Sequence, residues 1–286
     1  MKKVIRDVDQ KRGIMQITTS DERWYLKPGK DEKTGLPVYR PVPSVTWVAG
    51  YYPKGIGFYK WLAEKGWDEA EAVKQAAGDK GSVVHLALEM ILSGDEFRID
   101  TEVEDKSRST EQESYRRQLT YDELLCVWSF VNWRKSLEEA GTPLEVLATE
   151  ITVFSDIHNY AGTVDLVCRI GGVPYIVDFK TSKQVWTEYK MQVSAYRMAV
   201  ENGENPIAGP KGKPMDLSGL KVAILQVGYA LNGAGWKFTE VEDHFDLFLT
   251  AQKIWQNELP VKDKYPGFTQ REFPLVLSQA KDNGKS

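Results

Sequence analysis

The chain has 286 residues, of which 42% are hydrophobic and 27% charged, and its formal net charge is −4 at pH 7. These proportions are ordinary for a globular protein with a large core. No run of residues is long and apolar enough to cross a membrane, and the opening MKKVIRDVDQ lacks the apolar centre of a signal peptide. These features argue against a membrane-spanning or secreted chain, and we expect one cytoplasmic domain over residues 1–286.

The first 80 residues (1–80) are expected to form an elaboration, mainly helical, in front of the main domain. Their patterns predict, in chain order, a small hairpin over residues 14–26 around Ser20 and Asp21, a loop rich in lysine, glycine and proline, and helices over residues 58–65 and 68–77. Serine and aspartate are residues that favour the turn of such a hairpin.

A third helix is predicted over residues 81–93, because apolar residues recur along it at three- and four-residue spacing. Ser82, His85 and Glu89 share a second face of this helix. A polar outer face is the simplest interpretation of that face, and the alternative is that His85 binds a metal. Glu89 would then be a structural residue that orients the histidine.

Residues 94–120 are charged, rich in hydroxyl groups and poor in apolar side chains. This composition predicts a mobile surface insertion, for which a plain loop is a simpler account than a lid. The next segment, residues 121–140, is predicted to be a long helix. The side chains expected to face the core are Leu124, Val127, Trp128, Val131 and Leu137.

Strands and helices alternate in the second half of the chain. Strands are predicted over 147–154, 162–170, 173–180, 222–230 and 236–241, and helices over 185–200 and 245–256. The fold class is therefore α/β (α+β), with a central mixed sheet flanked by helices on both faces. The last residues, 276–286, are expected to form a loose tail.

The two strands within residues 162–180 carry the most informative chemistry. Gly171 and Gly172 suit a tight turn, and a two- or four-residue loop centred on them places Asp165 directly opposite Asp178. A three-residue loop would break this pairing. Lys180 shares a face with Asp178, because side chains alternate along a strand. The other face is apolar and is predicted to be core, with Val164, Leu166, Cys168, Ile170, Val173, Tyr175, Val177 and Phe179.

Two carboxylates that face each other across a sheet repel, and they lose hydration when partly buried. A divalent cation removes both costs, since Mg²⁺ and Mn²⁺ prefer oxygen ligands. With a lysine beside the cation, such a group can cleave a phosphodiester. A solvated strand end with an ordinary ion pair is the competing interpretation. Val177 and Phe179 favour the metal site, because they flank Asp178 in a run that otherwise indicates a buried strand.

Five short motifs occur in a recognisable order along the chain. They are PSVT at 43–46, GSVVH at 81–85, GTVD at 162–165, DFKTSK at 178–183 and QVSAY at 192–196. Together they resemble the RecB-type branch of the PD-(D/E)XK nuclease superfamily, which includes many bacteriophage exonucleases and the mitochondrial genome-maintenance exonuclease. The resemblance covers more than half of the chain and implies a restriction-endonuclease-like core, so that residues 1–286 would be a single nuclease domain.

The resemblance implies a role for each matched position. His85, Asp165, Asp178 and the backbone carbonyl of Phe179 would bind Mg²⁺ or Mn²⁺, and Lys180 would orient the attacking water or stabilise charge on the phosphate. Residues of second rank would be Glu150, on the strand before the first aspartate, and Gln192 and Tyr196. Residues that would contact DNA are Thr181, Ser182 and Lys183, although hydroxyls before a helix suit an N-cap equally well.

The function implied is a metal-dependent deoxyribonuclease, most simply an exonuclease that processes DNA ends in recombination, repair or replication. A bacterial or bacteriophage-infected cell would be its location, and a single-strand-binding protein or a recombinase would be its partner, with no membrane involved. Two alternatives stay open, a structure-specific endonuclease on the same site and a catalytically silent DNA-binding module.

Two further features of the composition bear on this function. Some RecB-type nucleases bind an iron–sulfur cluster with four cysteines, whereas this chain has only Cys126 and Cys168, so no cluster is expected. The net charge of −4 argues mildly against a nucleic-acid partner. It does not exclude one, because DNA responds to the local field rather than to the total charge.

Overall fold

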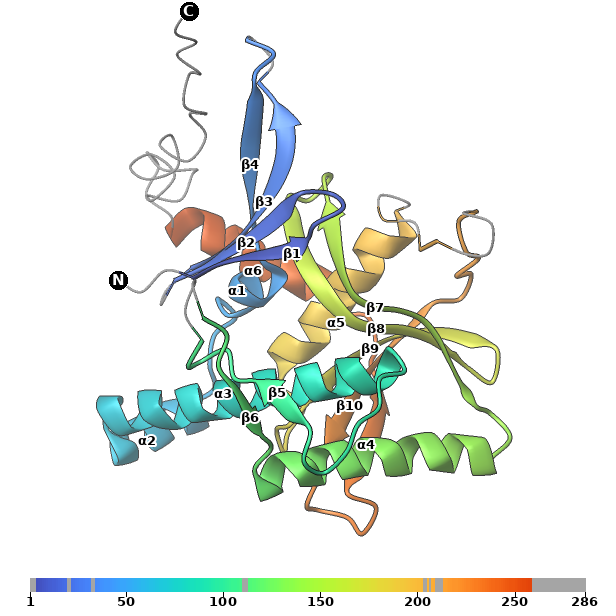
Figure 1. The fold of residues 1–286 in the computed structure, drawn as a ribbon. Helices are drawn as coiled ribbons and strands as arrows, with labels where there is room; N and C mark the ends of the chain where they lie inside the picture. Colours follow the sequence, from blue (N-terminus) through green and yellow to red (C-terminus); the bar gives the residue numbers. More distant parts are fainter. Residues whose placement is uncertain are drawn as a thin grey trace, which may run out of the picture.

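The computed structural model of the protein describes residues 4–258 apart from 20–21, 32–33, 110–112, 203–204, 206 and 209–212. Five strands form its centre, β7 (Leu144–Ser155), β8 (Tyr160–Ile170), β9 (Val173–Lys180), β10 (Lys221–Val227) and β11 (Trp236–Glu240). They make one sheet in the order β11-β10-β9-β8-β7 (Figure 1). Within it β9 and β10 are parallel and the other neighbours are antiparallel, which confirms the predicted mixed sheet.

Helices cover both faces of this sheet (Figure 1). On one face lie α3 (Trp67–Leu92) and α4 (Tyr121–Glu139), and on the other lie α1 (Val45–Ala49), α5 (Thr187–Glu201) and α6 (Phe245–Glu258). The side chains of β9 point alternately to the two faces of the sheet. Ile176 packs with α5, and Val177 packs with α3 and α4. Val164 was predicted to share the face of Leu166, but it packs with the α5 cluster. Val164 lies beyond Leu166, the last residue of β8 that pairs with β9, and pairs only with Ile151 of β7.

The N-terminal elaboration contains a sheet that was only partly predicted. Its strands are β1 (Val4–Asp9), β2 (Ile14–Thr18), β3 (Arg23–Lys30) and β4 (Pro37–Pro43), in that order. Thr18 pairs with Arg23, which is the register expected for the 14–26 hairpin, although its turn residues 20–21 lie outside the described residues. The charged β1 and the proline-rich β4 did not resemble strands. Both are edge strands, where charges and proline are tolerated because one side of the backbone needs no partner.

The helices of the elaboration are α2 (Ile56–Lys65) and α3, which is one continuous helix where two were predicted, over 68–77 and 81–93. Gly78 and Gly81 suggested an interruption, but glycine is tolerated inside a helix at a cost of about 1 kcal/mol relative to alanine. The first part of α3 is largely exposed and the second part is buried against the central sheet. His85 lies in this second part.

The core-facing side of α4 differs from the prediction at several residues. Trp128 is 69% exposed, whereas Cys126, Phe130 and Trp133 are buried. The helix turns its small residues towards the end of β10, where the hydroxyl of Ser129 accepts a hydrogen bond of 2.8 Å from the backbone N–H of Gly228. The small residues Cys126 and Ser129 lie against Gly228, and a search for large apolar side chains overlooks positions of this kind.

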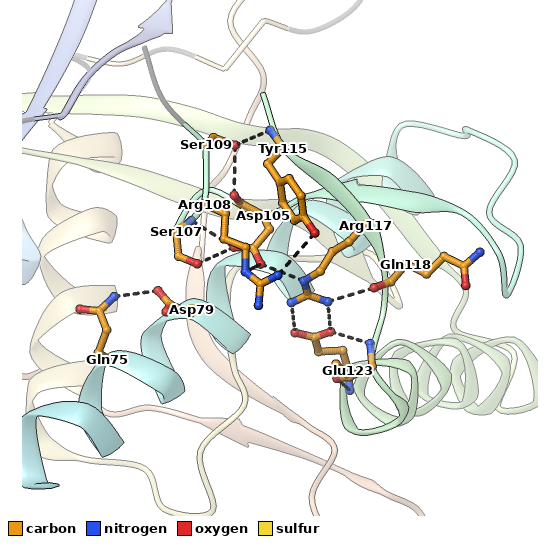
Figure 2. A network of polar contacts seen from close by, with 11 residues as sticks. Gln75, Asp79, Asp105, Ser107, Arg108, Ser109, Tyr115, Arg117, Gln118 and Glu123 are labelled. Atoms are coloured by element: carbon orange, nitrogen blue, oxygen red, sulfur yellow. Dashed lines mark hydrogen bonds and ion pairs between the residues drawn. The ribbon is translucent and has the colours of Figure 1, made fainter. Parts of the chain in front are cut away.

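The insertion at 94–120 contains a two-stranded sheet of β5 (Glu102–Glu104) and β6 (Arg116–Gln118). A network of polar contacts anchors it (Figure 2). Arg117 donates one hydrogen bond of 2.8 Å to Asp105 and two of 2.8 Å to Glu123, the third residue of α4. Charged side chains provide this anchoring. A segment rich in charge and poor in apolar residues was predicted to be a mobile insertion, so the composition did not reveal the anchoring.

The predicted tail at 276–286 lies outside the described residues. Among the helices that the structure does describe, none is both long and apolar enough to cross a membrane.

Candidate active site

The hairpin of β8 and β9 has the predicted register. Ile170 pairs with Val173 around Gly171 and Gly172, whose φ angles of 58° and 83° fit a tight two-residue turn. Paired residues continue as far as Leu166 and Val177. The two aspartates come next on each strand, where the ladder has ended, and the Asp165 side chain accepts a hydrogen bond of 2.8 Å from the backbone N–H of Phe179.

Asp178 and Lys180 form a buried ion pair at the end of β9. The ammonium lies 2.5 Å from Oδ2 of Asp178, and the two side chains are 16% (Lys180) and 2% (Asp178) exposed. Burial raises the pKa of Asp178 to about 6, with Lys180 opposing this and the charge of Asp165 adding to it. Burial lowers the pKa of Lys180, but the charges of Asp178 and Asp165 outweigh it and the pKa is raised. Lys180 therefore stays protonated at neutral pH.

His85 lies between two of the oxygen atoms that were expected to bind a cation. Its Nε2 is 2.9 Å from the carbonyl oxygen of Phe179, and its Nδ1 is 3.4 Å from Oδ1 of Asp165. Burial lowers the pKa of His85, but the charge and hydrogen bond of Asp165 outweigh burial and raise it to about 9. A pKa raised in this way favours the protonated ring at neutral pH, with its nitrogens facing the Phe179 carbonyl oxygen and the Asp165 carboxylate.

Glu150 lies closer to His85 and Asp165 than its second rank suggested. It lies on β7 between the pairs Thr149–Leu166 and Ile151–Val164, opposite Asp165, and has a positive φ of 49°. Such a backbone conformation is uncommon for glutamate and cannot be read from the sequence. Burial raises the pKa of Glu150 to about 8, and the charge of Asp165 adds to the increase.

The other predicted site residues surround this group. Glu89 was expected to orient His85, but no hydrogen bond joins them among the described residues, because both ring nitrogens face other partners. Thr181, Ser182 and Lys183 precede α5, whose N-cap is Trp186, so they do not cap the helix. The Ser182 hydroxyl donates to the carbonyl oxygen of Gln184 at 2.8 Å, and Lys183 is exposed.

Gln192 and Tyr196 lie one turn apart on α5 and are buried beneath the site. The Gln192 side-chain amide donates to the Tyr196 hydroxyl at 2.8 Å. The tyrosine ring packs against Gly162 so closely that a Cβ there would lie 2.3 Å from its Cε1 atom. The glycine of the GTVD motif is therefore required for space.

We expect Gly162→Ala to lower the free energy of unfolding by about 2 kcal/mol, because the buried ring must move to admit the methyl group. Urea denaturation of the purified variants measures this change. Gly233→Ala is the matched control, since no atom lies within 4 Å of a Cβ at that position. Equal stability of the two variants would contradict the packing argument.

Two contributors to the site were not predicted. The Tyr25 hydroxyl lies 2.9 Å from Oγ1 of Thr163, two residues before Asp165, although the pair is separated by 138 positions in sequence. Lys106, from the turn after β5, places its charge near Glu89 and Glu150. No local pattern signals either contact, because each depends on how distant segments pack.

The donor atoms fit a divalent cation. His85, Glu150 and Asp165 each offer one ligand atom, and these atoms lie within 4.8 Å of one another. Oδ2 of Asp178 is buried, and it makes no hydrogen bond of ordinary geometry with any described residue despite the nearby ammonium. Carboxylate oxygens with one imidazole nitrogen are suitable ligands for Mg²⁺ or Mn²⁺.

Comparison with known proteins adds one match. The model of a family described as the PD-(D/E)XK nuclease superfamily matches residues 58–257, a range that includes His85, Glu150, Asp165, Asp178 and Lys180. No curated protein matches the chain.

Proposed function

Since the chain belongs to the PD-(D/E)XK nuclease superfamily, we propose that it is a DNA exonuclease that uses Mg²⁺ or Mn²⁺ to hydrolyse phosphodiester bonds at DNA ends. The observation that carries this proposal is the grouping of His85, Glu150 and Asp165 beside the buried ion pair of Asp178 and Lys180. End processing in recombination, repair or replication, in a bacterial or bacteriophage-infected cell, is the role that the RecB-type motifs favour.

In this proposal the acidic side chains and His85 hold the cation, together with the carbonyl oxygen of Phe179. A bound cation would supply charge for the phosphate and lower the pKa of a water molecule. Lys180 keeps its proton and donates to a phosphate oxygen or to the attacking water. The Lys180 ammonium is restrained by Asp178 at 2.5 Å and by the ring of Tyr189, whose centroid is 4.7 Å away. A donor held in place in this way stabilises developing charge without having to reorganise.

Metal affinity is expected to rise with pH between about 6 and 9. The pKa values of His85 and Glu150 are raised to about 9 and about 8, so both groups hold a proton at neutral pH that a cation must displace. As the pH rises through these values the protons leave and the competition ends. Calorimetric titration with Mn²⁺ in two buffers of different ionisation enthalpy measures the affinity and the protons released. An affinity that is independent of pH, with no proton release, would contradict this account.

A digestion assay with separately labelled ends tests the function. Linear single- and double-stranded DNA should shorten from an end with Mg²⁺ or Mn²⁺ and stay intact with chelator, and circular DNA should persist. Cutting of circular single-stranded DNA, or of the intact strand of nicked circular DNA, would establish the endonuclease alternative. Binding without cleavage in either metal would instead establish a silent DNA-binding module.

A further inference from the structure

Three partly buried cations gather beside the acidic group. They are Arg6 on β1, Arg23 on β3 and Lys106 in the turn after β5, and we refer to them as the cationic edge. Arg6 and Arg23 lie near enough for their charges to oppose each other, as do Arg6 and Lys106. Within the described part of the chain none of the three has an ion pair or a side-chain hydrogen bond. The charge of Glu104 acts on Arg6 and Lys106, and those of Glu150 and Glu89 act on Lys106, but burial outweighs them and the pKa values of Arg6 and Lys106 are lowered.

The N-terminal sheet directs two of these cations to the site. Arg6 pairs with Gln16 and Gln16 with Tyr25, so the three residues share one face of the sheet. Arg23, two residues before Tyr25, is on the same face. This face is docked on β8 by the contact of 2.9 Å between the Tyr25 hydroxyl and Thr163, and β1 also contacts β7, the strand of Glu150. The family match begins at residue 58, so the sheet lies outside the matched range.

The turn that carries the third cation, Lys106, is anchored through its neighbours Asp105 and Ser107, which belong to the network in Figure 2. Asp105 accepts hydrogen bonds of 3.1 Å from the backbone N–H and 2.6 Å from the hydroxyl of Ser107, and one of 2.8 Å from Arg117. These contacts restrain the backbone on both sides of Lys106. Val103, which precedes the turn, packs in the core with α3, the helix of His85. Lys106 is therefore presented to the site by an anchored turn.

Like charges that are brought together with no hydrogen-bonded partner and partly removed from water are unfavourable, and an anion bound between them removes this cost. A nucleic-acid backbone that enters the proposed site supplies anions at regular intervals along this edge. We propose that Arg6, Arg23 and Lys106 bind backbone phosphates that flank the bond to be cleaved, and that they thereby position the DNA strand. This inference rests on the proposed function. The surface belongs to β1, β3 and the turn after β5, which contribute none of the proposed metal ligands.

The test measures DNA affinity against salt concentration for Arg6→Gln, Arg23→Gln and Lys106→Gln, by fluorescence anisotropy of a short labelled DNA with Ca²⁺ in place of Mg²⁺ or Mn²⁺. Each variant should bind about five- to tenfold more weakly at about 0.1 M salt, and the slope of log affinity against log salt should fall by about one. Arg6→Lys, which keeps the charge, should retain most of the affinity. Arg40→Gln is the matched control, since Arg40 is an exposed cation on β4 of the same sheet.

Melting temperatures and circular dichroism establish that each variant is folded, and metal affinity is measured in parallel. Unchanged DNA affinity and salt slope in all three folded variants would overturn the proposal that the cationic edge binds DNA. A changed metal affinity with unchanged DNA binding would also overturn the proposal, because these residues would then only balance the charge of the acidic side chains. If the unaltered chain cuts DNA and the variants bind like it, only this inference fails. If the unaltered chain neither binds nor cuts DNA, the proposed function fails with it.

Discussion

Asp178→Asn is expected to lower metal-dependent cleavage about a hundredfold or more while leaving the protein folded. The change keeps the shape of a side chain that is 2% exposed but removes its charge. Lys180 then loses the carboxylate at 2.5 Å that restrains it, and the proposed cation loses an oxygen ligand. Lys180→Ala should cause a loss of similar size, because it removes the only amine in contact with that carboxylate among the described residues.

Initial rates on end-labelled linear DNA at saturating Mn²⁺ measure this effect, and thermal melting shows whether the variants are folded. Asp68→Asn is the matched control, because Asp68 is an exposed aspartate in the first turn of α3. Full activity of folded Asp178→Asn or Lys180→Ala would remove that residue from the proposed mechanism.

Arg117→Met is expected to lower the free energy of unfolding by about 3 kcal/mol. The guanidinium joins Asp105 and Glu123, whose side chains are 5% and 4% exposed. Its loss leaves Glu123 without a cation among the described residues and leaves Asp105 with only the exposed Arg108, at 3.7 Å. Breaking a buried ion pair from one side typically costs about 3–5 kcal/mol, and the lower end applies because the Arg117 side chain is itself 20% exposed.

The same contacts predict a dependence on pH. Burial raises the pKa values of Asp105 and Glu123, but hydrogen bonds from Ser107 and Arg117 outweigh burial, and both values are lowered from their ordinary 3.8 and 4.5. A lowered carboxyl pKa stabilises the protein above the ordinary value, and this stability is lost as the pH falls through the folded value. The unaltered chain should therefore lose stability below about pH 4.5, and Arg117→Met should lose less over the same range.

Urea denaturation at neutral and acid pH measures both effects. Arg98→Met is the matched control, because Arg98 is 69% exposed and its ion pairs of 3.7 and 3.4 Å lie at the surface. That control should change stability by no more than about 0.5 kcal/mol. Arg117→Lys should recover only part of the loss, since lysine cannot bind both oxygens of Glu123 as a fork. Equal stability of Arg117→Met and Arg98→Met would show that the network contributes little.

The parts of the fold that local rules determine were predicted from sequence. Gly171 and Gly172 define a turn, and the alternation of side chains on either side then specifies the register of β8 and β9. The strands and helices from α4 onwards follow the same logic, since their apolar patterns extend over many residues. The fold class is confirmed by the family match, which covers residues 58–257.

What could not be predicted depends on contacts between distant segments. β1 and β4 are strands because of the neighbours they pair with, against the preferences of their own charges and prolines. Trp128 is exposed because α4 turns Cys126, Phe130 and Trp133 towards the sheet instead. Glu150 joins the acidic group through a backbone conformation that glutamate rarely adopts, and Tyr25 reaches Thr163 from the far end of the chain.

The positive charges of His85 and Lys180 bear on the order in which the protein folds and binds metal. Each faces an aspartate, so the polypeptide carries its own counter-ions where the acids converge. Folding of the chain would therefore not depend on an inorganic ion to neutralise these acids. In the function proposed above, binding of a cation would then follow folding and would displace the proton of His85, so that cleavage would begin only after this exchange.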